Sequence, residues 1–552
     1  MHSNKVDSNA YNKKRENMIR SKLPKIGLSA LTVMMLSGCV KLGPNFTGLD
    51  APPVPKNWTQ GSNKVNQDAI AQWWKTFNDP TLNTLVKKAY AQNLDIKSAG
   101  LRILQSRAAL GISEGLSFPQ VQTLSGSAAT TRNGGHTFEI ANLGFDMGWE
   151  MDIWGKYARG IESSEANLYA TVSSYNDIMV SVIAEVARNY INYRTAEERL
   201  AYAVRNVTIQ ERVTQMTEVQ FNSGNVSELD MQQARTQLYN TRSGLPSLEL
   251  SKVKARNAIG LLLAVNSNEV SKLLSRGTKR KADSKSRYIS MDKKGAMQIK
   301  EGTSNLLNIN MIPRARLNPY NKIDADLITR RPDIKIAEYK VQSNSALIGT
   351  KMADLYPSFS LFGNIGYNTN NATGSWVTGS DALGVTIGPA FSWNIFQYGR
   401  IKNQIRLQDA VFEESLVNYN KKVLSAVSEV SDALNGYILT KKQQAENRKA
   451  VDATVRAFNI SVIQYNDGLV NYQRLLTTVE KLTSTQDRYA SIKGNLAINA
   501  ILLYKALGGG WQMSKGRAYL SEETAAKMKK RVDWGKYLDA NMTRLPKGMT
   551  DE

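Results

Sequence analysis

The sequence contains very few of the residues that most often carry enzyme chemistry or bind metal ions. Its 552 residues include one cysteine, Cys39, and two histidines, His2 and His136. A single cysteine excludes a disulfide bond within the chain. The sequence also contains no His-rich or Cys-rich metal motif, no Walker loop and no nucleophile elbow. We therefore expect no catalytic residues, no metal site and no cofactor.

Proline and large aromatic residues are also scarce. Proline occurs 14 times, and Phe, Trp and Tyr make up 8% of the residues, although 42% of all residues are apolar. This composition favours long, solvated helices over a thick globular core.

Acidic residues are outnumbered by basic ones, 48 against 71, which gives a net charge of +23. The densest basic run lies between Arg276 and Lys300, in a polar segment that we interpret as a solvated insertion. Its cations are Lys279, Arg280, Lys281, Lys285, Arg287, Lys293 and Lys294. No zinc-finger spacing, RNA-binding aromatic signature or basic zipper supports binding to nucleic acid.

The N-terminus resembles a secretory signal. Basic residues up to Lys25 precede an apolar stretch from Ile26 to Leu36, which is too short to span a bilayer. The following Leu36-Ser-Gly-Cys39 resembles a bacterial lipobox, in which the cysteine becomes the acylated first residue of the mature protein. We expect Met18 to be the true start. The alternative is an incidental cysteine beside an ordinary cleavage site.

The chain is duplicated. The run Tyr465-Asn-Asp-Gly468 repeats Phe221-Asn-Ser-Gly224 at a spacing of 244 residues. Pro357 is likewise the counterpart of Pro119, at a spacing of 238 residues. A period of about 240 residues is too long for a solenoid repeat, so it indicates domain duplication. An enzyme active site gains little from such duplication, whereas a pseudo-symmetric tube or ring gains a great deal.

Each half contains one very long helical pattern, over residues 159–222 and 403–466. At 1.5 Å per residue, each helix would be roughly 95 Å long. Each pattern stops just before a glycine, Gly224 or Gly468, and a second helical pattern then returns. Two antiparallel coiled-coil hairpins are therefore predicted.

A different period occurs between the helices. From Gly384 to Ile395, apolar residues alternate with small or polar ones, which predicts a membrane-type strand of about ten residues. The segment 359–367 supplies a partner, and 121–132 and 138–151 are weaker equivalents. A soluble hairpin would show the same alternation. Four strands cannot close a barrel, so strands that span a membrane would require an oligomer.

Several short motifs occur in a fixed order along the chain. They are Leu42-Gly-Pro-Asn-Phe46, Trp74-Lys-Thr-Phe-Asn-Asp-Pro80, Thr329-Arg-Arg-Pro-Asp-Ile334, Tyr356-Pro-Ser-Phe359, Asn394-Ile-Phe-Gln-Tyr-Gly-Arg400 and Tyr465-Asn-Asp-Gly468. Together with the duplication and the lipobox, they resemble the TolC-like outer-membrane efflux proteins over about residues 39–511. The resemblance is to the lipoprotein branch, which serves resistance–nodulation–division pumps.

The resemblance implies a mainly α fold with a membrane β-barrel portion. Long antiparallel coiled-coil hairpins would form an α-helical tunnel, and four strands per chain would contribute to a twelve-stranded barrel in a homotrimer. The protein would lie in the cell outer membrane, anchored by lipid at Cys39, and extend into the periplasm. Its partners would be a periplasmic adaptor (membrane fusion) protein, an inner-membrane pump and outer-membrane lipid. It would passively conduct small toxic compounds or drugs to the exterior.

The predicted organisation follows from these patterns. It comprises a signal peptide at 1–38, a lipidated tether at 39–72, a first repeat at 73–263, a basic equatorial insertion at 264–328, a second repeat at 329–511 and a polar C-terminal segment at 512–552. The charged run at Arg330, Arg331 and Asp333 is interpreted as structural, because Pro332 suits the first position of a helix and Asp333 favours its positive end.

The family constricts its tunnel at the periplasmic tip, so we expect gate residues beside the two tip glycines. The candidates are Gly224, Asp230, Asp467, Gly468, Gln473, Arg474, Thr477 and Glu480. Relatives usually carry an aspartate where this chain has Thr477. Three Arg474 side chains around one axis would repel each other unless paired with Asp467, Asp230 or Glu480, and such pairs would hold the mouth closed. Alternatively, these residues are merely solvated coiled-coil faces.

Two other functions fit the same patterns. A channel for type I protein secretion would use the same tube. A non-conducting lipoprotein scaffold could span the periplasm with its coiled coils and carry soluble hairpins.

Overall fold

The computed structural model describes residues 40–49, 70–275, 311–315, 317, 329–540 and 542–543, and the backbone of 285–291 and 297–303. Cys39, the signal peptide, most of the tether and most of the basic insertion lie outside the described residues. The chain divides into two compact units. Unit 1 comprises Met1–Gly48, Ala108–Asn167 and Lys340–Leu416, and unit 2 comprises Leu49–Arg107, Leu168–Tyr339 and Val417–Glu552.

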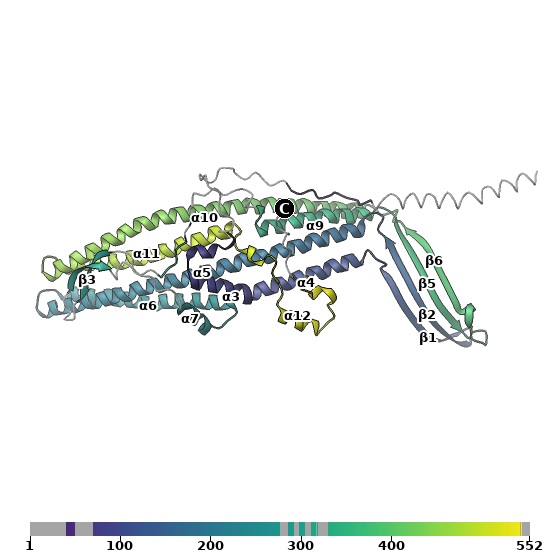
Figure 1. Cartoon of the computed structure of the whole chain (residues 1–552), viewed down its shortest axis with the longest axis horizontal. Helices are drawn as coiled ribbons and strands as arrows, with labels where there is room; N and C mark the ends of the chain where they lie inside the picture. The colour runs from purple at the N-terminus through teal and green to yellow at the C-terminus, as the bar shows by residue number, and fades with distance from the viewer. Residues whose placement is uncertain are drawn as a thin grey trace, which may run out of the picture. The chain divides into compact units, whose positions relative to one another are not determined.

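Apart from one additional helix at the start of the first half, the two halves of the chain contain the same order of elements (Figure 1). The first half contains α3 (Pro80–Gln92), α4 (Leu94–Gly115), β1 (Val121–Asn133), β2 (His136–Met151), α5 (Lys156–Asn222) and α6 (Glu228–Leu263). The second contains α9 (Pro332–Ala353), β5 (Ser358–Asn370), β6 (Leu383–Ser392), α10 (Arg400–Asn466) and α11 (Tyr472–Ala506). The predicted mainly helical, duplicated fold with four strands is confirmed.

Shorter elements lie outside this repeated set. They are η1 (Trp73–Phe77), α7 (Ser267–Ser275), the hairpin of β3 (Lys285–Met291) and β4 (Met297–Thr303), η2 (Gly379–Ala382), η3 (Trp511–Ser514), α12 (Glu522–Lys529) and η4 (Gly535–Leu538). None of the described helices combines the length and the apolar composition needed to cross a bilayer.

The long helices α5 and α10 have 67 residues each. The return helices α6 and α11 have 36 and 35 residues, so both predicted hairpins form. We call α5–α6 the first hairpin and α10–α11 the second hairpin. Within a protein, a long helix gains most of its stability from the packing of its apolar face against a neighbour. In the second hairpin, α10 and α11 provide such faces for each other.

The strands of unit 1 form one antiparallel sheet in the order β1-β2-β5-β6. The predicted strand from Gly384 to Ile395 is wrong at its end, because β6 stops at Ser392. Ser392 pairs with Ser358, the first residue of β5, so there is no partner backbone beyond it. Trp393 and Ile395 therefore follow the strand in an irregular segment, where the Trp393 indole N–H donates to the carbonyl of Leu355 at 3.0 Å.

A buried ion pair ties the insertion to the helices within unit 2. The carboxylate of Glu198 on α5 is 0% exposed and pairs with the ammonium of Lys493 on α11. Its second oxygen accepts backbone N–H bonds from Met311 at 3.0 Å and Ile312 at 3.4 Å. One carboxylate thus connects α5, α11 and the end of the insertion.

We predict that Lys493→Met destabilises the protein, because it leaves the Glu198 carboxylate buried without its cation. Breaking such a pair from one side costs about 3–5 kcal/mol. The melting temperature of the detergent-solubilised protein measures the effect. The double variant Glu198→Gln/Lys493→Met should recover part of the loss, since no buried charge remains. A single variant as stable as the unchanged protein would contradict this assignment.

Candidate functional site

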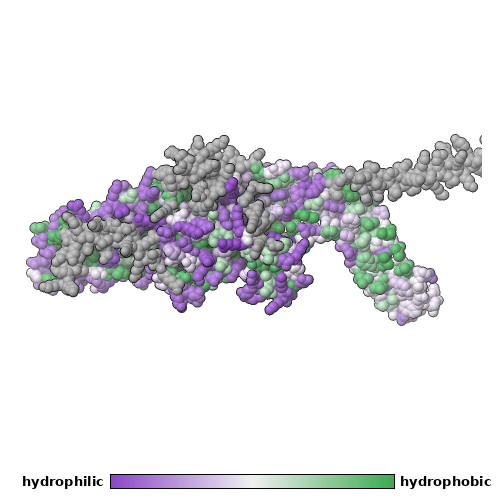
Figure 2. Space-filling view, viewed as in Figure 1, coloured by the Kyte–Doolittle hydropathy of each residue, from purple (hydrophilic) through white to green (hydrophobic). Residues whose placement is uncertain are grey.

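The four-stranded sheet of unit 1 has one apolar and exposed face. Cross-strand pairing aligns Leu124 on β1, Phe145 on β2, Ile365 on β5 and Val385 on β6 in one row. These side chains are 71%, 41%, 53% and 63% exposed, respectively. Figure 2 shows apolar residues gathered over this sheet. A water-facing surface would not normally expose an apolar row on every strand.

The neighbouring row has the opposite character. Thr123, Asp146, Asn364 and Thr386 pair across the same four strands, one residue along from the apolar row. Successive side chains of a strand point to opposite faces, so this row lies on the other face. The Asn364 side-chain amide donates to the Asp146 carboxylate at 2.6 Å, which links β2 and β5 on the polar face. One apolar and one polar face are typical of a membrane strand set around a lumen.

The tips of the two hairpins are set by two glycines. Gly224 has φ +74° and Gly468 has φ +71°, in the left-handed region where a side chain is strained. The return helix α6 then begins with a capping box, in which the Ser227 hydroxyl accepts from the Asp230 N–H and the Asp230 carboxylate accepts from the Ser227 N–H. At α11, the Asn471 side chain accepts from the backbone N–H of Arg474 at 3.3 Å.

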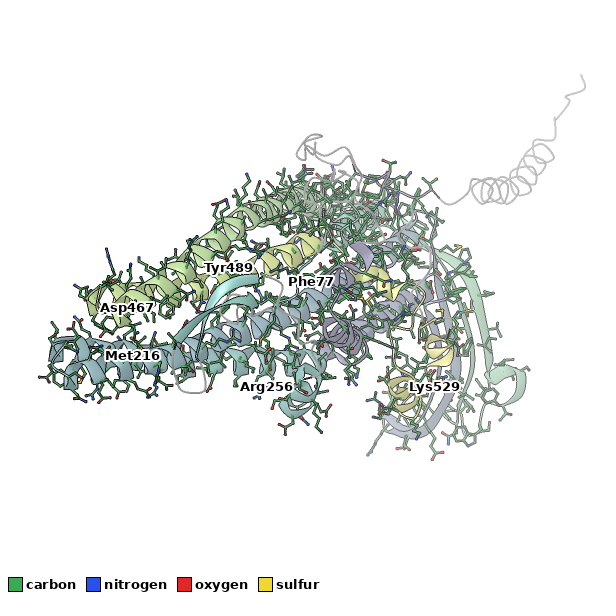
Figure 3. The ribbon with its side chains drawn as sticks, turned by 60° about the vertical axis from the view of Figure 1, so that its left-hand side comes forward. Phe77, Met216, Arg256, Asp467, Tyr489 and Lys529 are labelled. Atoms are coloured by element: carbon green, nitrogen blue, oxygen red, sulfur yellow. The ribbon has the colours of Figure 1, made fainter. Side chains whose placement is uncertain are left out.

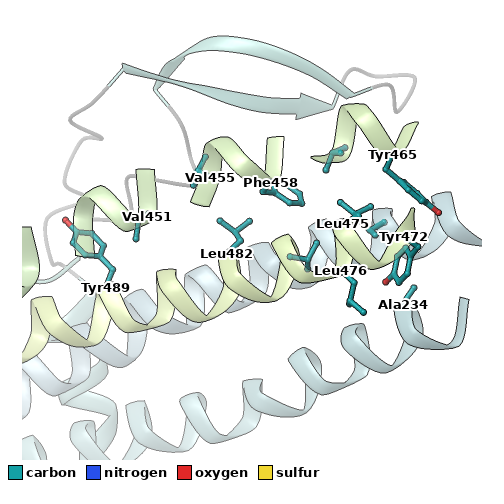
Figure 4. Packing of buried hydrophobic residues seen from close by; sticks show 13 residues of the cluster. Ala234, Val451, Val455, Phe458, Tyr465, Tyr472, Leu475, Leu476, Leu482 and Tyr489 are labelled. Carbon is teal, nitrogen blue, oxygen red and sulfur yellow. The ribbon is translucent and has the colours of Figure 1, made fainter. Parts of the chain in front are cut away.

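An apolar cluster lies directly behind the tip of the second hairpin (Figure 4). It packs Phe458 and Val462 of α10 against Leu475 and Val479 of α11. The rings of Tyr465 and Tyr472 meet edge to face at 6.0 Å. This cluster holds the second hairpin together independently of the charged residues at its end.

Two buried phenols sit within that cluster. Burial, with the nearby phenol of Tyr465 and the Asp230 carboxylate, raises the pKa of Tyr472. Burial likewise raises the pKa of Tyr465, although its hydrogen bond with Thr217 opposes the shift. Both phenols therefore remain protonated at neutral pH. The Tyr465 hydroxyl donates to the Thr217 hydroxyl at 3.4 Å, which joins the second hairpin to α5.

The predicted gate residues are solvent-exposed at the tips. Asp467, Gln473, Arg474, Thr477 and Glu480 are all exposed, and Figure 3 shows Asp467 at the end of the second hairpin. The Thr477 hydroxyl donates to the Gln473 carbonyl at 2.9 Å, a bond within the helix.

The charged members of this set do not pair with each other inside one chain. Asp230 is held by Ser227, whose hydroxyl also donates to it at 2.7 Å. Among the residues that the structure describes, Arg474 has no ion-pair partner, and neither Asp467 nor Glu480 has one.

The charged run at the start of α9 forms a structural network that joins helices of unit 2. Pro332 is the first residue of α9, as predicted. The buried Arg331 guanidinium donates to Asp333 at 2.8 and 3.0 Å, to Glu429 at 2.7 Å and to the carbonyl of Ala506 at 2.8 Å. Burial disfavours the charge of Asp333, but hydrogen bonds from Arg331 and Lys422 outweigh it and lower the pKa of that carboxyl.

Arg159 was not predicted as a functional residue from the sequence. Within unit 1, its side chain binds the segment of the chain that follows Cys39. Its guanidinium is 1% exposed and donates to the carbonyls of Leu42 at 2.9 Å and Gly43 at 3.2 Å, and to the Asn45 side chain at 2.7 Å. The clamped segment lies against Gly349, where a Cβ atom would approach the Leu42 carbonyl oxygen to 2.3 Å. Gly349 lies 238 residues after Gly111, the same spacing as between Pro357 and Pro119, but this repeat does not identify the partner of Arg159.

Comparison with known proteins connects these features. The family model "Outer membrane efflux protein" matches residues 85–265 and 325–509, which is most of the chain. The chain is similar to the probable outer membrane lipoprotein SilC of Salmonella typhimurium, with 27% identity over 88% of this chain and 98% of that protein. It is also similar to the cation efflux system protein CusC of Escherichia coli O6:H1, with 24% identity over 87% of this chain and 97% of that protein.

A solved structure agrees with the sequence relatives. The outer-membrane channel OprN superposes with a TM-score of 0.72 and 27% sequence identity, over 85% of this chain and 99% of that one. It shares with this chain the mainly helical fold with a small strand portion. The extent of the family match, the exposed apolar sheet and the duplicated hairpins lead to one conclusion: the chain belongs to the outer membrane efflux protein family and is an efflux channel of the outer membrane.

Proposed function

We propose that three copies of this chain form the outer-membrane duct of a three-part efflux system. A periplasmic adaptor and an inner-membrane pump of the resistance–nodulation–division type deliver small toxic compounds or drugs, which the duct conducts passively to the exterior. The observation that carries this proposal is the four-stranded sheet, which has one exposed apolar face, one polar face and two unpaired edges at β1 and β6.

The free edges support assembly from several copies. Backbone N–H and C=O groups in hydrocarbon must bond within the protein, so a sheet in lipid cannot keep an open edge. If β6 of one copy pairs with β1 of the next, the ring closes after a fixed number of copies. Three copies give twelve strands, the arrangement that the sequence resemblance implies.

The proposed cargo is a class of compound rather than one molecule. The relatives' names cover different cargoes, such as the cations of the CusC system and the pyoverdine exported through OpmQ of Pseudomonas aeruginosa. Their identity to this chain is 24% in both cases, so similarity does not favour either cargo. Among the described residues, no group of three or more His, Cys, Asp or Glu could hold a metal ion.

We further propose that Cys39 carries the lipid anchor. Three residues after it, Leu42 is held by Arg159, and the Leu42 N–H also donates to the Trp154 carbonyl at 3.2 Å. A fixed Leu42 keeps an acyl group on Cys39 within reach of unit 1, whose sheet carries the apolar face. The anchor and the strands would then enter the same membrane.

Ile387→Lys is predicted to impair membrane assembly, because Ile387 lies on the apolar face of β6 and is 72% exposed. A lysine facing lipid at the bilayer midplane costs about 2–4 kcal/mol. The matched control is Thr386→Lys, one residue away on the polar face. The fraction of protein that forms detergent-resistant trimers in outer-membrane extracts measures assembly. Equal loss in both variants would contradict the assignment of the two faces.

Cys39→Ser should abolish labelling by radioactive palmitate, because the acceptor thiol is lost. Part of the protein should stay in the membrane fraction, since strands and acyl chains contribute separately to membrane attachment. Mass spectrometry of the unchanged mature protein should give an acylated N-terminal Cys39. Palmitate labelling that survives the substitution would disprove the anchor.

Arg474→Ala should raise the resting conductance of the isolated trimer. In the closed mouth, Arg474 of one copy would pair with Asp467, Asp230 or Glu480 of the next, and each such pair contributes on the order of 1 kcal/mol. The matched control is Arg488→Ala, an arginine further along α11. Single-channel recording at low and high salt measures the effect. If Arg474→Ala conducts like the unchanged channel in both salts, closure depends on helix packing instead.

A further inference from the structure

The C-terminal segment forms a separate small module on unit 2. The family match ends at residue 509 and α11 ends at Ala506, whereas the described chain continues to residue 543. The module contains η3, α12 and η4, and several of its apolar side chains are buried. Tyr519, Leu520, Met528 and Leu538 are each at most 7% exposed. The module is therefore an ordered addition to the matched fold.

The module is fixed to α4 by close contacts. A Cβ atom on Gly100 would lie 2.2 Å from the Tyr519 carbonyl oxygen, so only glycine permits this approach. The Arg107 guanidinium lies over the Tyr519 ring at 5.9 Å. The Tyr519 N–H donates to the Thr543 carbonyl at 3.0 Å, and its hydroxyl donates to the Met542 carbonyl at 2.9 Å. Any surface that the module carries is thus held in a fixed orientation.

The end of α12 carries an unneutralised group of cations. Lys529 and Lys530 are exposed, and Arg531 follows them, exposed as well; Figure 3 shows Lys529 on the α12 ribbon. Within the described part of the chain, none of the three has an ion-pair partner, whereas Lys527 on the same helix pairs with Glu523 at 2.6 Å. The helix dipole favours cations at this end but does not neutralise them. Three adjacent like charges gain most from an anionic ligand.

Apolar and aromatic side chains continue the same stretch, together with one exposed carboxylate, Asp533, which accepts from the Gly535 N–H at 2.8 Å. Val532 is 63% exposed, and Trp534 and Tyr537 are half-buried. An indole or phenol face offers a flat apolar surface that suits a sugar ring, and neighbouring cations suit carboxylates. We call Lys529, Lys530, Arg531 and Trp534 the basic patch. Its chemistry combines recognition of a carboxylate with recognition of a carbohydrate.

We propose that the basic patch binds peptidoglycan, the cell-wall polymer whose glycan strands carry carboxylate-bearing peptides. This inference rests on the proposed function, which places unit 2 in the periplasm beside the cell wall. The excess of basic over acidic residues in the chain adds a long-range attraction to such a polyanion. Binding would hold the duct at the cell wall through the C-terminal module. The two hairpins would not take part in this contact.

The test measures cosedimentation of the full-length, detergent-solubilised trimer with isolated peptidoglycan sacculi. The variant Lys529→Glu/Lys530→Glu/Arg531→Glu should bind at least about tenfold more weakly, because it reverses the charge of the patch. The matched control Lys441→Glu/Lys442→Glu/Arg448→Glu makes the same change in net charge on exposed residues of α10. It should bind within about twofold of the unchanged protein. Trp534→Ala should weaken binding about threefold if the indole contacts a sugar ring.

Three results would overturn the proposal. The first is an unchanged trimer that does not bind sacculi. The second is an equal loss of binding in both triple variants, which would indicate total charge rather than the patch. A tenfold preference for vesicles of anionic phospholipid over sacculi would assign the patch to a membrane surface instead. Conductance in planar bilayers, recorded for every variant, separates this question from the duct itself. A variant that loses sacculus binding but conducts normally would show an effect on the patch and none on the duct. A protein without substitutions that never conducts would contradict the proposed function.

Discussion

Hydrogen bonding of the backbone in a water-free environment is the constraint on which the rest of this structure depends. Each N–H and C=O group of β1, β2, β5 and β6 must find a protein partner if the apolar face of their sheet lies in lipid. Within the chain, β2 and β5 have partners on both sides, and β1 and β6 have a partner on one side. The unpaired edges therefore explain why a single copy is an incomplete channel.

The helical part solves a different problem, because long hairpins must stay in register without a thick core. Inside the second hairpin an apolar cluster that includes Val455 and Leu482 joins the two helices. Between α5 and α11 there are polar contacts as well as apolar ones. The Asn206 amide donates to Gln486 at 3.2 Å, and the Arg199 guanidinium binds Asp487 at 2.7 and 3.0 Å. Apolar contacts supply most of the free energy, whereas directional polar contacts fix which residues face each other.

Much of the fold could be predicted from the sequence because its signals were periodic. The long helices were predicted to within three residues at their starts, and their ends at Asn222 and Asn466 coincide with the predicted ends. Gly224 and Gly468 gave the turns, since a positive φ favours glycine. The end of β6 could not be predicted, because the alternation continues past Ser392 and the partner strand, not the sequence pattern, sets the boundary.

The sites were harder to predict than the fold. Arg159 and Glu198 bind residues more than one hundred positions away, and no local pattern identifies such partners. The same limit applies to the proposed gate. The sequence placed Arg474, Asp467 and Glu480 near the tips, but their charges have no mutual partner within the described chain, and their role in a gate stays a proposal. The basic patch was also hidden, since a polar C-terminal segment gives no periodic signal.

Electrical recording from the purified full-length protein in planar lipid bilayers tests the central claim most directly. If three copies close one barrel around a polar lumen, insertion should produce discrete, long-lived conductance steps of uniform size. Cross-linking before reconstitution should show that the conducting species is a trimer. Protein that inserts into the bilayer as a trimer and produces no conductance, even after Arg474→Ala, would contradict the account and would favour a non-conducting scaffold.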